Sequence, residues 1–467
     1  MRRSTEYFLI AVLALCLLLL CACGAQPAAS PEPAPAATQE PAAEATPEPP
    51  AEILLAGQTY PADTEALDLS GCELPAEELF AALEGFSSLR EISLGLTGLS
   101  GEELSRLGEI CPDAALHWQV SLAGETLDND TESLDLGALT AEELDEACQA
   151  LSRLPALRSV NLIPADGGPT ALSPEEIDRL AAAAPQADFD CAFELYGQLA
   201  GPETEELRYK RTNIGNEGIA RFRQALPYLR SLKLLRLENC GITDNEQMDA
   251  LRSDFPEVNV VWSVMIGGYM CMTDTDLLNC PLMRDKDIET LQYLHDVLYL
   301  DVGHNAYLSN IEFVKNFPKL QVVIVTLTNI TDISPLKDCP DIEFLEMVST
   351  GIENIDVVAG MEKLEYLNLG CMWNLRDITP VFGLKNLKIV RICGTTYEHI
   401  TREDVEAMKA ALPESTFVSD YGGDPTTSGG WRFNIGTGGY TERYALLREQ
   451  MLYDKHWEKR MFRSLSE

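Results

Sequence analysis

The chain has 467 residues, of which 23% are charged and 46% are apolar, a composition typical of a folded protein. Its 74 acidic residues outnumber its 35 basic ones, and the formal charge of −39 argues against nucleic acid as a partner and against docking on anionic lipid through a basic patch. The length exceeds one ordinary compact core, so an elongated or repetitive body is expected.

Residues 1–23 have the features of an export signal. Two arginines precede a continuous apolar run from Tyr7 to Leu20, which is short for a membrane helix. The following Leu20-Cys21-Ala22-Cys23 is similar to a bacterial lipobox, whose cysteine is lipidated and becomes the new N-terminus. This resemblance makes Cys23 the expected lipidation site and implies an extracytoplasmic protein anchored to the cell membrane. The alternative is an uncleaved membrane anchor.

Residues 24–51 form a segment rich in proline, alanine and glutamate. They contain eight prolines, ten alanines, four glutamates and no aromatic residue. Such a composition cannot bury a core, so we expect an extended tether between the membrane and a folded body.

Residues 52–296 contain long repeat units with helical patterns. The segments TEALDLSGCEL, LREISLGLTGL and LKLLRLENCGI keep a common pattern at positions 1, 4, 6, 9 and 11, with apolar residues at positions 4, 6 and 11. They resemble leucine-rich repeats of the ribonuclease-inhibitor type, in which position 9 is often cysteine or asparagine. The expected strand centres are Leu67, Ile92, Leu134, Val160, Leu207, Leu235 and Leu278.

A longer module recurs over this region. Its copies share Pro112, Pro185, Pro256 and Pro413, and the first two gaps are 73 and 71 residues. Each copy opens with a serine or threonine suited to capping a helix, carries acidic residues in the first turn, and ends at the proline before a strand.

Residues 297–423 contain shorter units. Five units follow one another at spacings of 23, 22, 22 and 23 residues, and they begin with VLYLDV, LQVVIV, IEFLEM, LEYLNL and LKIVRI. Asp332-Ile333-Ser334-Pro335 and Asp377-Ile378-Thr379-Pro380 resemble the turn motif of the internalins, which are bacterial surface leucine-rich repeat proteins. The internalin asparagine at the strand end is replaced by threonine at positions 328, 350 and 395, whose hydroxyl can still bond the turn backbone.

The repeats predict an α/β fold, a leucine-rich repeat solenoid with parallel strands on a curved concave face and helices or short turns on the convex face. Positions 4 and 6 point into the core, so positions 3 and 5 should point to the concave side. We call the five residues at position 3 the stripe and expect them to be solvent-exposed. The predicted ligand-binding residues are the stripe, Tyr299, Val322, Phe344, Tyr366 and Ile389, together with Asp301, Glu346 and Arg391 at position 5. The alternative is a stripe covered by another part of the chain.

Residues 424–467 are interpreted as a glycine-rich linker followed by a helical cap. GGWRFNIGTGG lacks the lysine of a phosphate loop and is expected to be flexible. Thr441 should cap a helix that presents Tyr444, Leu447 and Met451 on one face. We expect this helix to cover the open core of the last repeat, and the alternative is a helix that binds a partner.

Catalytic and metal-binding patterns are missing from the sequence. The ten cysteines after residue 23 include no C-x-x-C pair, and Cys72 and Cys240 fall at positions expected to be core. A few disulfides remain possible outside the cytoplasm. The sequence predicts a non-enzymatic surface lipoprotein without a cofactor or metal, whose repeats bind a protein or glycan. The alternative function is a structural or assembly component of the cell envelope without a discrete ligand.

Overall fold

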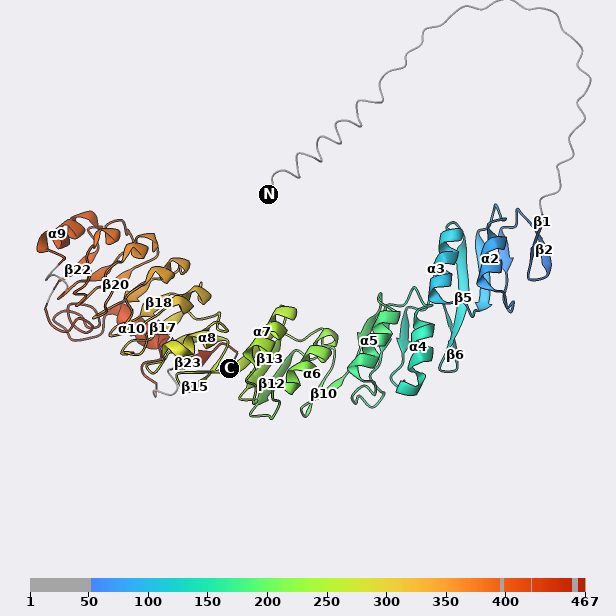
Figure 1. Cartoon of the computed structure of the whole chain (residues 1–467), viewed down its shortest axis with the longest axis horizontal. Helices are drawn as coiled ribbons and strands as arrows, with labels where there is room; N and C mark the ends of the chain where they lie inside the picture. Colours follow the sequence, from blue (N-terminus) through green and yellow to red (C-terminus); the bar gives the residue numbers. More distant parts are fainter. Residues whose placement is uncertain (1–51, 395–398, 421, 456–460, 467) are drawn as a thin grey trace, which may run out of the picture. The chain divides into compact units, whose positions relative to one another are not determined.

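The computed structural model describes residues 52–394, 399–420, 422–455 and 461–466. The expected signal, the lipidation site Cys23, the whole tether and Thr395 therefore lie outside the described residues. Over the described part, parallel strands alternate with helices in chain order, so the fold is an α/β repeat fold (Figure 1). No helix among the described residues is long and apolar enough to cross a membrane.

Three sheets and two separate hairpins lie in the first half of the described chain. The first sheet has the order β3-β4-β5-β6, the second β7-β8-β9 and the third β12-β13-β14-β15. The bounds are β1 (Glu52–Leu55), β2 (Gln58–Pro61), β3 (Ala66–Asp68), β4 (Glu91–Leu96), β5 (Ala115–Leu122), β6 (Glu125–Asp128), β7 (Ser133–Asp135), β8 (Ser159–Asn161), β9 (Asp188–Asp190), β10 (Phe193–Leu195), β11 (Gln198–Ala200), β12 (Glu206–Lys210), β13 (Leu234–Glu238), β14 (Asn259–Ile266) and β15 (Tyr269–Met272). The strand centres predicted between Leu67 and Leu235 all lie within these strands.

Antiparallel hairpins interrupt the parallel strands, a feature that the repeat pattern did not predict. The turns between β5 and β6, β10 and β11, and β14 and β15 each place two consecutive residues at positive φ. These pairs are Ala123-Gly124, Tyr196-Gly197 and Gly267-Gly268. Two positive φ angles suit the two-residue turn that matches strand twist, and glycine adopts the second without strain.

The second half is built around one eight-stranded sheet. Its order is β22-β21-β20-β19-β18-β17-β16-β23, and only β23 runs antiparallel to its neighbour. The bounds are β16 (Thr275–Asn279), β17 (Tyr299–Asp301), β18 (Val322–Ile324), β19 (Phe344–Glu346), β20 (Tyr366–Asn368), β21 (Ile389–Arg391), β22 (Phe417–Ser419) and β23 (Phe462–Ser464). The register of β17 to β21 pairs equivalent positions of successive units, as the repeat spacing predicts.

The return segments change from α-helices to shorter 3₁₀ turns along the chain. The helices are α2 (Ala76–Leu83), α3 (Gly101–Ile110), α4 (Leu144–Leu151), α5 (Pro174–Ala183), α6 (Glu217–Ala225), α7 (Asn245–Asp254), α8 (Ile288–Leu291), α9 (Arg402–Ala411) and α10 (Glu442–Gln450). The 3₁₀ segments are η1 (Ala141–Glu143), η2 (Leu226–Tyr228), η3 (Asp285–Asp287), η4 (Glu312–Asn316), η5 (Ser334–Asp338), η6 (Asp356–Gly360) and η7 (Thr379–Val381).

Side-chain caps fix where the module helices begin. Ser100, Ser173 and Thr401 each form a capping box at the start of α3, α5 and α9. For α7 the N-cap is Asp244, not the serine or threonine that the module pattern predicts. Aspartate serves equally well because its carboxylate accepts from the free backbone N–H groups of the first turn.

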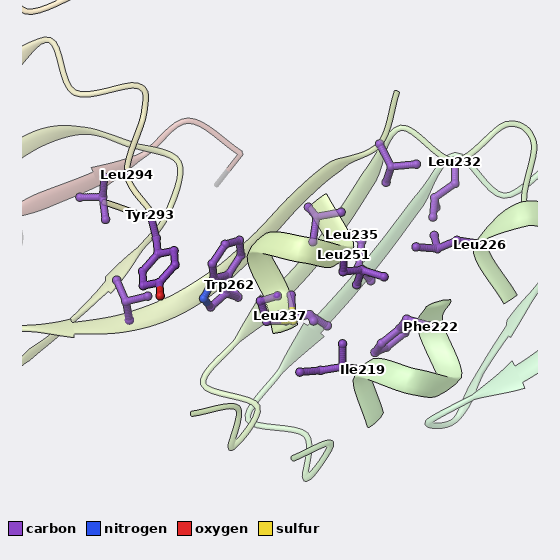
Figure 2. Close-up of a cluster of buried hydrophobic side chains, with 14 of the residues drawn as sticks. Ile219, Phe222, Leu226, Leu232, Leu235, Leu237, Leu251, Trp262, Tyr293 and Leu294 are labelled. Atoms are coloured by element: carbon purple, nitrogen blue, oxygen red, sulfur yellow. The ribbon is translucent and has the colours of Figure 1, made fainter. Parts of the chain in front are cut away.

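The main core lies between the strands and the return segments. Figure 2 shows this arrangement around β13, where Phe222 of α6 and Leu251 of α7 point toward Leu235 of the strand. Trp262 of β14 continues the packing to Tyr293, with ring centroids 6.0 Å apart. Leu278 of β16 and the central residues of β17 to β21 belong to the same buried cluster, which confirms that position 4 points into the core.

Candidate functional site

The stripe lies on the sheet face opposite the main core, as the two-residue alternation of a strand predicts. The parallel register of β17 to β21 aligns the stripe in one row, which consists of Tyr299, Val322, Phe344, Tyr366 and Ile389. The row beside it consists of Asp301, Ile324, Glu346, Asn368 and Arg391. We call this surface of the sheet the stripe face.

The prediction that the stripe is solvent-exposed is wrong. Residues 424–466, here called the C-terminal segment, return over the stripe face, and their side chains form a second buried cluster with it. Trp431, Leu447 and Met451 enter this cluster from the C-terminal segment. Phe344 is 3% exposed, and its ring centroid lies 5.1 Å from that of Trp431. Tyr299, Tyr366 and Ile389 are half-buried against the same cluster. Five apolar side chains in a row favour burial, and the chain supplies its own cover.

The glycine-rich part of this segment is an ordered turn, not the flexible linker that its composition suggests. Gly429 has φ +67°, and a Cβ atom there would lie 2.2 Å from Nη1 of Arg391. Only glycine fits this approach, because the backbone angle and the contact both exclude a side chain. The turn places the Trp431 indole, which is 4% exposed, onto the sheet.

The helix of the C-terminal segment begins as predicted but covers a different surface. Thr441 caps α10 by accepting a hydrogen bond from the N–H of Tyr444 at 3.2 Å. Leu447 of α10, and Met451 just beyond its end, pack on the stripe face, so the helix does not close the open core of the last repeat. Beyond it the chain forms β23, which pairs with β16 at the opposite edge of the sheet from β22.

Glu346 is a buried carboxylate at the centre of this contact. It is 1% exposed and accepts hydrogen bonds from Trp431 Nε1 and from Thr326 Oγ1 at 2.9 Å, while Arg432 Nη2 lies 3.4 Å away. Burial raises the pKa of Glu346, and the Arg432 guanidinium and the two hydrogen bonds oppose that change. The nearby Asp301 carboxylate accepts a hydrogen bond from the Tyr453 hydroxyl at 2.6 Å.

Two more arginines lie buried in the contact. Arg391 is fully buried and donates to Ser419 Oγ at 2.8 Å and to Ser428 Oγ at 3.2 Å. Arg443 stacks over the stripe, with its guanidinium carbon 5.1 Å from the ring centroid of Phe344 and 5.6 Å from that of Tyr366. Burial lowers the pKa of Arg443. In the described part of the chain no carboxylate lies within ion-pair distance of either arginine.

The end of the C-terminal segment joins the two large sheets. Arg463 makes a bidentate ion pair with Asp276 at 2.7 and 2.6 Å, and Ser464 Oγ donates to the carboxylate of Asp274. Arg236 of β13 donates to Ser464 Oγ at 2.5 Å. The last described residues therefore contact both the four-stranded sheet of β13 and the sheet of β16.

The equivalent face of the first sheets has no such cover among the described residues. Its register rows contain small, polar and acidic side chains: Ala66, Glu91 and Ala115; Asp68, Ser93 and His117; Ser133, Ser159 and Asp188; Asp135, Asn161 and Asp190. A hollow of about 270 Å³ opens beside the first of these sheets, lined by polar groups such as Ser93, His117, Gln119 and Asp130. The stripe is thus apolar in the sheet that the C-terminal segment covers. The equivalent rows of the first sheets are largely polar, and nothing in the described chain covers them in this way.

The cysteines largely occupy packed positions, with one correction. Cys240 is buried as predicted, whereas Cys72 is exposed and lines an open hollow of about 570 Å³ beside α2. Cys72 follows Gly71 in the turn of the terminal repeat strand, β3, so no preceding repeat unit packs over it. Burial raises the pKa of Cys191 and Cys339 to about 12. The ten cysteines of the described chain are unpaired, and no group of histidine, cysteine and acidic residues there could hold a metal ion.

The threonines at the strand ends act as the sequence suggests. Thr328 Oγ1 donates to the carbonyl of Val325 at 2.7 Å, and Thr350 Oγ1 donates to that of Met347 at 2.9 Å. The Asp332 carboxylate accepts from the backbone N–H of Ser334 at 2.8 Å, which fixes the turn before η5.

No known family profile and no curated protein match the chain. Similar solved structures are internalin C2 of Listeria monocytogenes (18% identity, 54% of this chain, 85% of that chain, TM-score 0.26), the internalin inlF of the same organism (14%, 75%, 90%, 0.27) and a leucine-rich repeat protein of Leptospira interrogans (16%, 77%, 90%, 0.27). TM-scores this low do not establish a common overall architecture. The assignment of leucine-rich-type repeats rests on the strand register and the inward residues described above.

Proposed function

We propose that the protein is a non-enzymatic, ligand-binding surface lipoprotein, lipidated at Cys23 and tethered by residues 24–51. In this proposal the repeats form a curved solenoid that binds a protein ligand outside the cytoplasm through the uncovered face of β3 to β9. The observation that carries it is the contrast between the two halves. The stripe face is apolar and covered by the chain itself, whereas the first sheets present polar side chains to solvent.

The chemistry of the uncovered face favours a protein with a basic surface. Asp68, Glu91, Asp135 and Asp188 are exposed on it, and the whole chain is strongly acidic. Opposite charges on two proteins guide their encounter and their orientation. The aromatic rings that would stack on a glycan lie instead under the C-terminal segment, which favours a protein over a glycan as the ligand.

A capture experiment with charge-reversal variants tests the proposed face. The full mature chain carrying Glu91→Lys and Asp188→Lys should capture at least tenfold less of its ligand from an envelope extract than the parent chain. The matched control carries Glu109→Lys and Glu146→Lys, two exposed acids on α3 and α4. The proposal requires capture by the parent and by the control. Equal capture by all three chains would contradict the choice of face.

A second candidate function is a structural or assembly component of the cell envelope without a discrete ligand. The covered stripe favours it, because the most apolar face of the repeats is used within the molecule. Absence of any captured protein for the parent chain would support this candidate.

A further inference from the structure

We infer that the stripe face is a second binding surface, for a partner-protein segment that carries an aromatic ring next to an arginine, and that the C-terminal segment is an autoinhibitory occupant of this surface. This inference goes beyond the binding face proposed above and does not depend on it. Three features of the contact carry it.

First, residues 431–455 of the C-terminal segment pack on a cluster that is separate from the main core, whereas Met461 belongs to the main core. Trp431, Leu447 and Met451 contact the stripe, whereas Leu345 and Leu367 face the other side of the sheet within the main core. This part of the segment can therefore leave the stripe face while β23 stays paired with β16 and the core of the repeats stays closed. In repeat proteins, stability is a sum of local unit and neighbour contributions, so one contact can open while the array stays folded.

Second, polar groups are poorly satisfied at this contact. The described chain has five buried side-chain nitrogen or oxygen atoms without a hydrogen-bond partner, and three belong to Arg391, Arg432 and Arg443. Each such atom loses its hydrogen bonds to water without gaining a partner, which destabilises the contact. Opening would return Arg432 and Arg443 to water, and a ligand with better placed acceptors would remove the same cost.

Third, the contact defines what a competing ligand must offer. The carboxylates of Glu346 and Asp301 accept from an indole N–H, a guanidinium and a phenol, supplied here by Trp431, Arg432 and Tyr453. Residues 431–467 carry seven basic and five acidic residues in a chain of charge −39, so the occupant is basic on an acidic body. A partner segment with an aromatic ring followed by arginine reproduces these groups.

A peptide-binding experiment on the full chain tests the inference. The probe is a labelled synthetic peptide of residues 428–455, measured by fluorescence anisotropy. Leu447→Ala with Met451→Ala weakens the packing of the C-terminal segment, and Leu446→Ala is the matched control because Leu446 is 48% exposed on the same helix. We expect the double variant to bind the peptide at least tenfold more tightly than the parent or the control, since a linked occupant competes at high effective concentration.

Two further measurements make the result decisive. Adding Phe344→Ala to the double variant should abolish peptide binding, which assigns the site to the stripe. Limited proteolysis should cut the double variant first within its glycine-rich turn and leave the repeats intact. The inference would be overturned if the double variant failed to bind the peptide while its repeats resisted protease. It would also be overturned if the parent bound the peptide equally well. Either result would identify the C-terminal segment as a permanent cover. Neither outcome affects the charge-reversal test, because the two experiments use different faces.

Discussion

At the residue scale, Phe344 shows how one side chain joins the sheet to the C-terminal segment. Its ring contacts those of Trp431 and Tyr366, and Arg443 stacks over it. Offset aromatic pairs and a desolvated guanidinium over a ring each add to the energy of burial. The row contains apolar residues because it is an interior surface, although it lies on the face that a repeat array usually presents to solvent.

Truncation of this ring should destabilise the protein. We expect Phe344→Ala to lower the free energy of unfolding by about 3–5 kcal/mol, the usual loss for a buried phenylalanine. Tyr307→Ala, at a position 72% exposed in the same sheet region, should change it by less than about 0.5 kcal/mol. Urea unfolding followed by circular dichroism measures both. A loss for Phe344→Ala as small as the control would show that the stripe is open in solution.

At the element scale, a buried carboxylate lies where the C-terminal segment contacts the sheet. Glu346 of β19 is held between Trp431 and Arg432 of the C-terminal segment and lies near Asp301 of β17. Its pKa is raised in the folded protein, so folding favours the protonated form. The stability that this group contributes is complete below its unfolded pKa, near 4.5, and is lost as the pH rises through the folded pKa.

The pH dependence of stability should therefore change when this group is removed. We expect Glu346→Gln to remove a component of the parent's stability that grows as the pH falls through the folded pKa of Glu346 toward 4.5. One proton contributes a slope of at most about 1.4 kcal/mol per pH unit. Thermal unfolding of both chains across this range provides the measurement, and the difference between them isolates Glu346 from the other acids. Parallel pH curves would mean that Glu346 does not change protonation on folding.

Elements with a short period could be predicted from the sequence, and distant pairings could not. The strands from β16 to β21 follow a 22–23 residue spacing because each inward residue is needed to fill the core of its own unit. The pairing of β23 with β16 joins Arg463 to Thr275 across 188 residues, and no periodicity encodes it. The hairpin turns, such as Ala123-Gly124, did leave a local signal in the residue-glycine pair.

The candidate site divides in the same way. The alternation of a strand predicts which side chains share a face, so the row through Phe344 could be derived. Whether another part of the chain covers that row depends on where Trp431 docks, which is a tertiary fact. A tryptophan among glycines was the available signal, since a large apolar ring in a flexible linker would remain in water at a cost.

At the scale of the whole molecule, the two halves of the described chain differ in what they present to solvent. The first sheets expose polar and acidic side chains, and the eight-stranded sheet covers its apolar row with the basic C-terminal segment. The high net negative charge of the whole chain supports its solubility. The proposed partner surface, in contrast, occupies only one part of the molecule. Anchoring through Cys23 would hold both faces near the membrane at the reach of the tether.

Anchoring makes a prediction of its own. We expect Cys23→Ser to leave an unprocessed precursor that takes up no lipid label, because the thiol of this residue is the proposed site of attachment. Metabolic labelling with a fatty-acid analogue, followed by immunoblotting for precursor size, provides the measurement, and Cys21→Ser is the control that should be processed normally. Labelling of the Cys23→Ser chain would move the attachment to another residue.

The covering of the stripe by residues 431–451 also sets the order of events during synthesis. The ribosome makes β17 to β21 before these residues, so the aromatic row remains uncovered until they emerge. Any chain that stops short of Trp431 presents that row permanently to other unfinished chains. Premature termination near the end of the gene would therefore yield an aggregation-prone product, although every repeat is present.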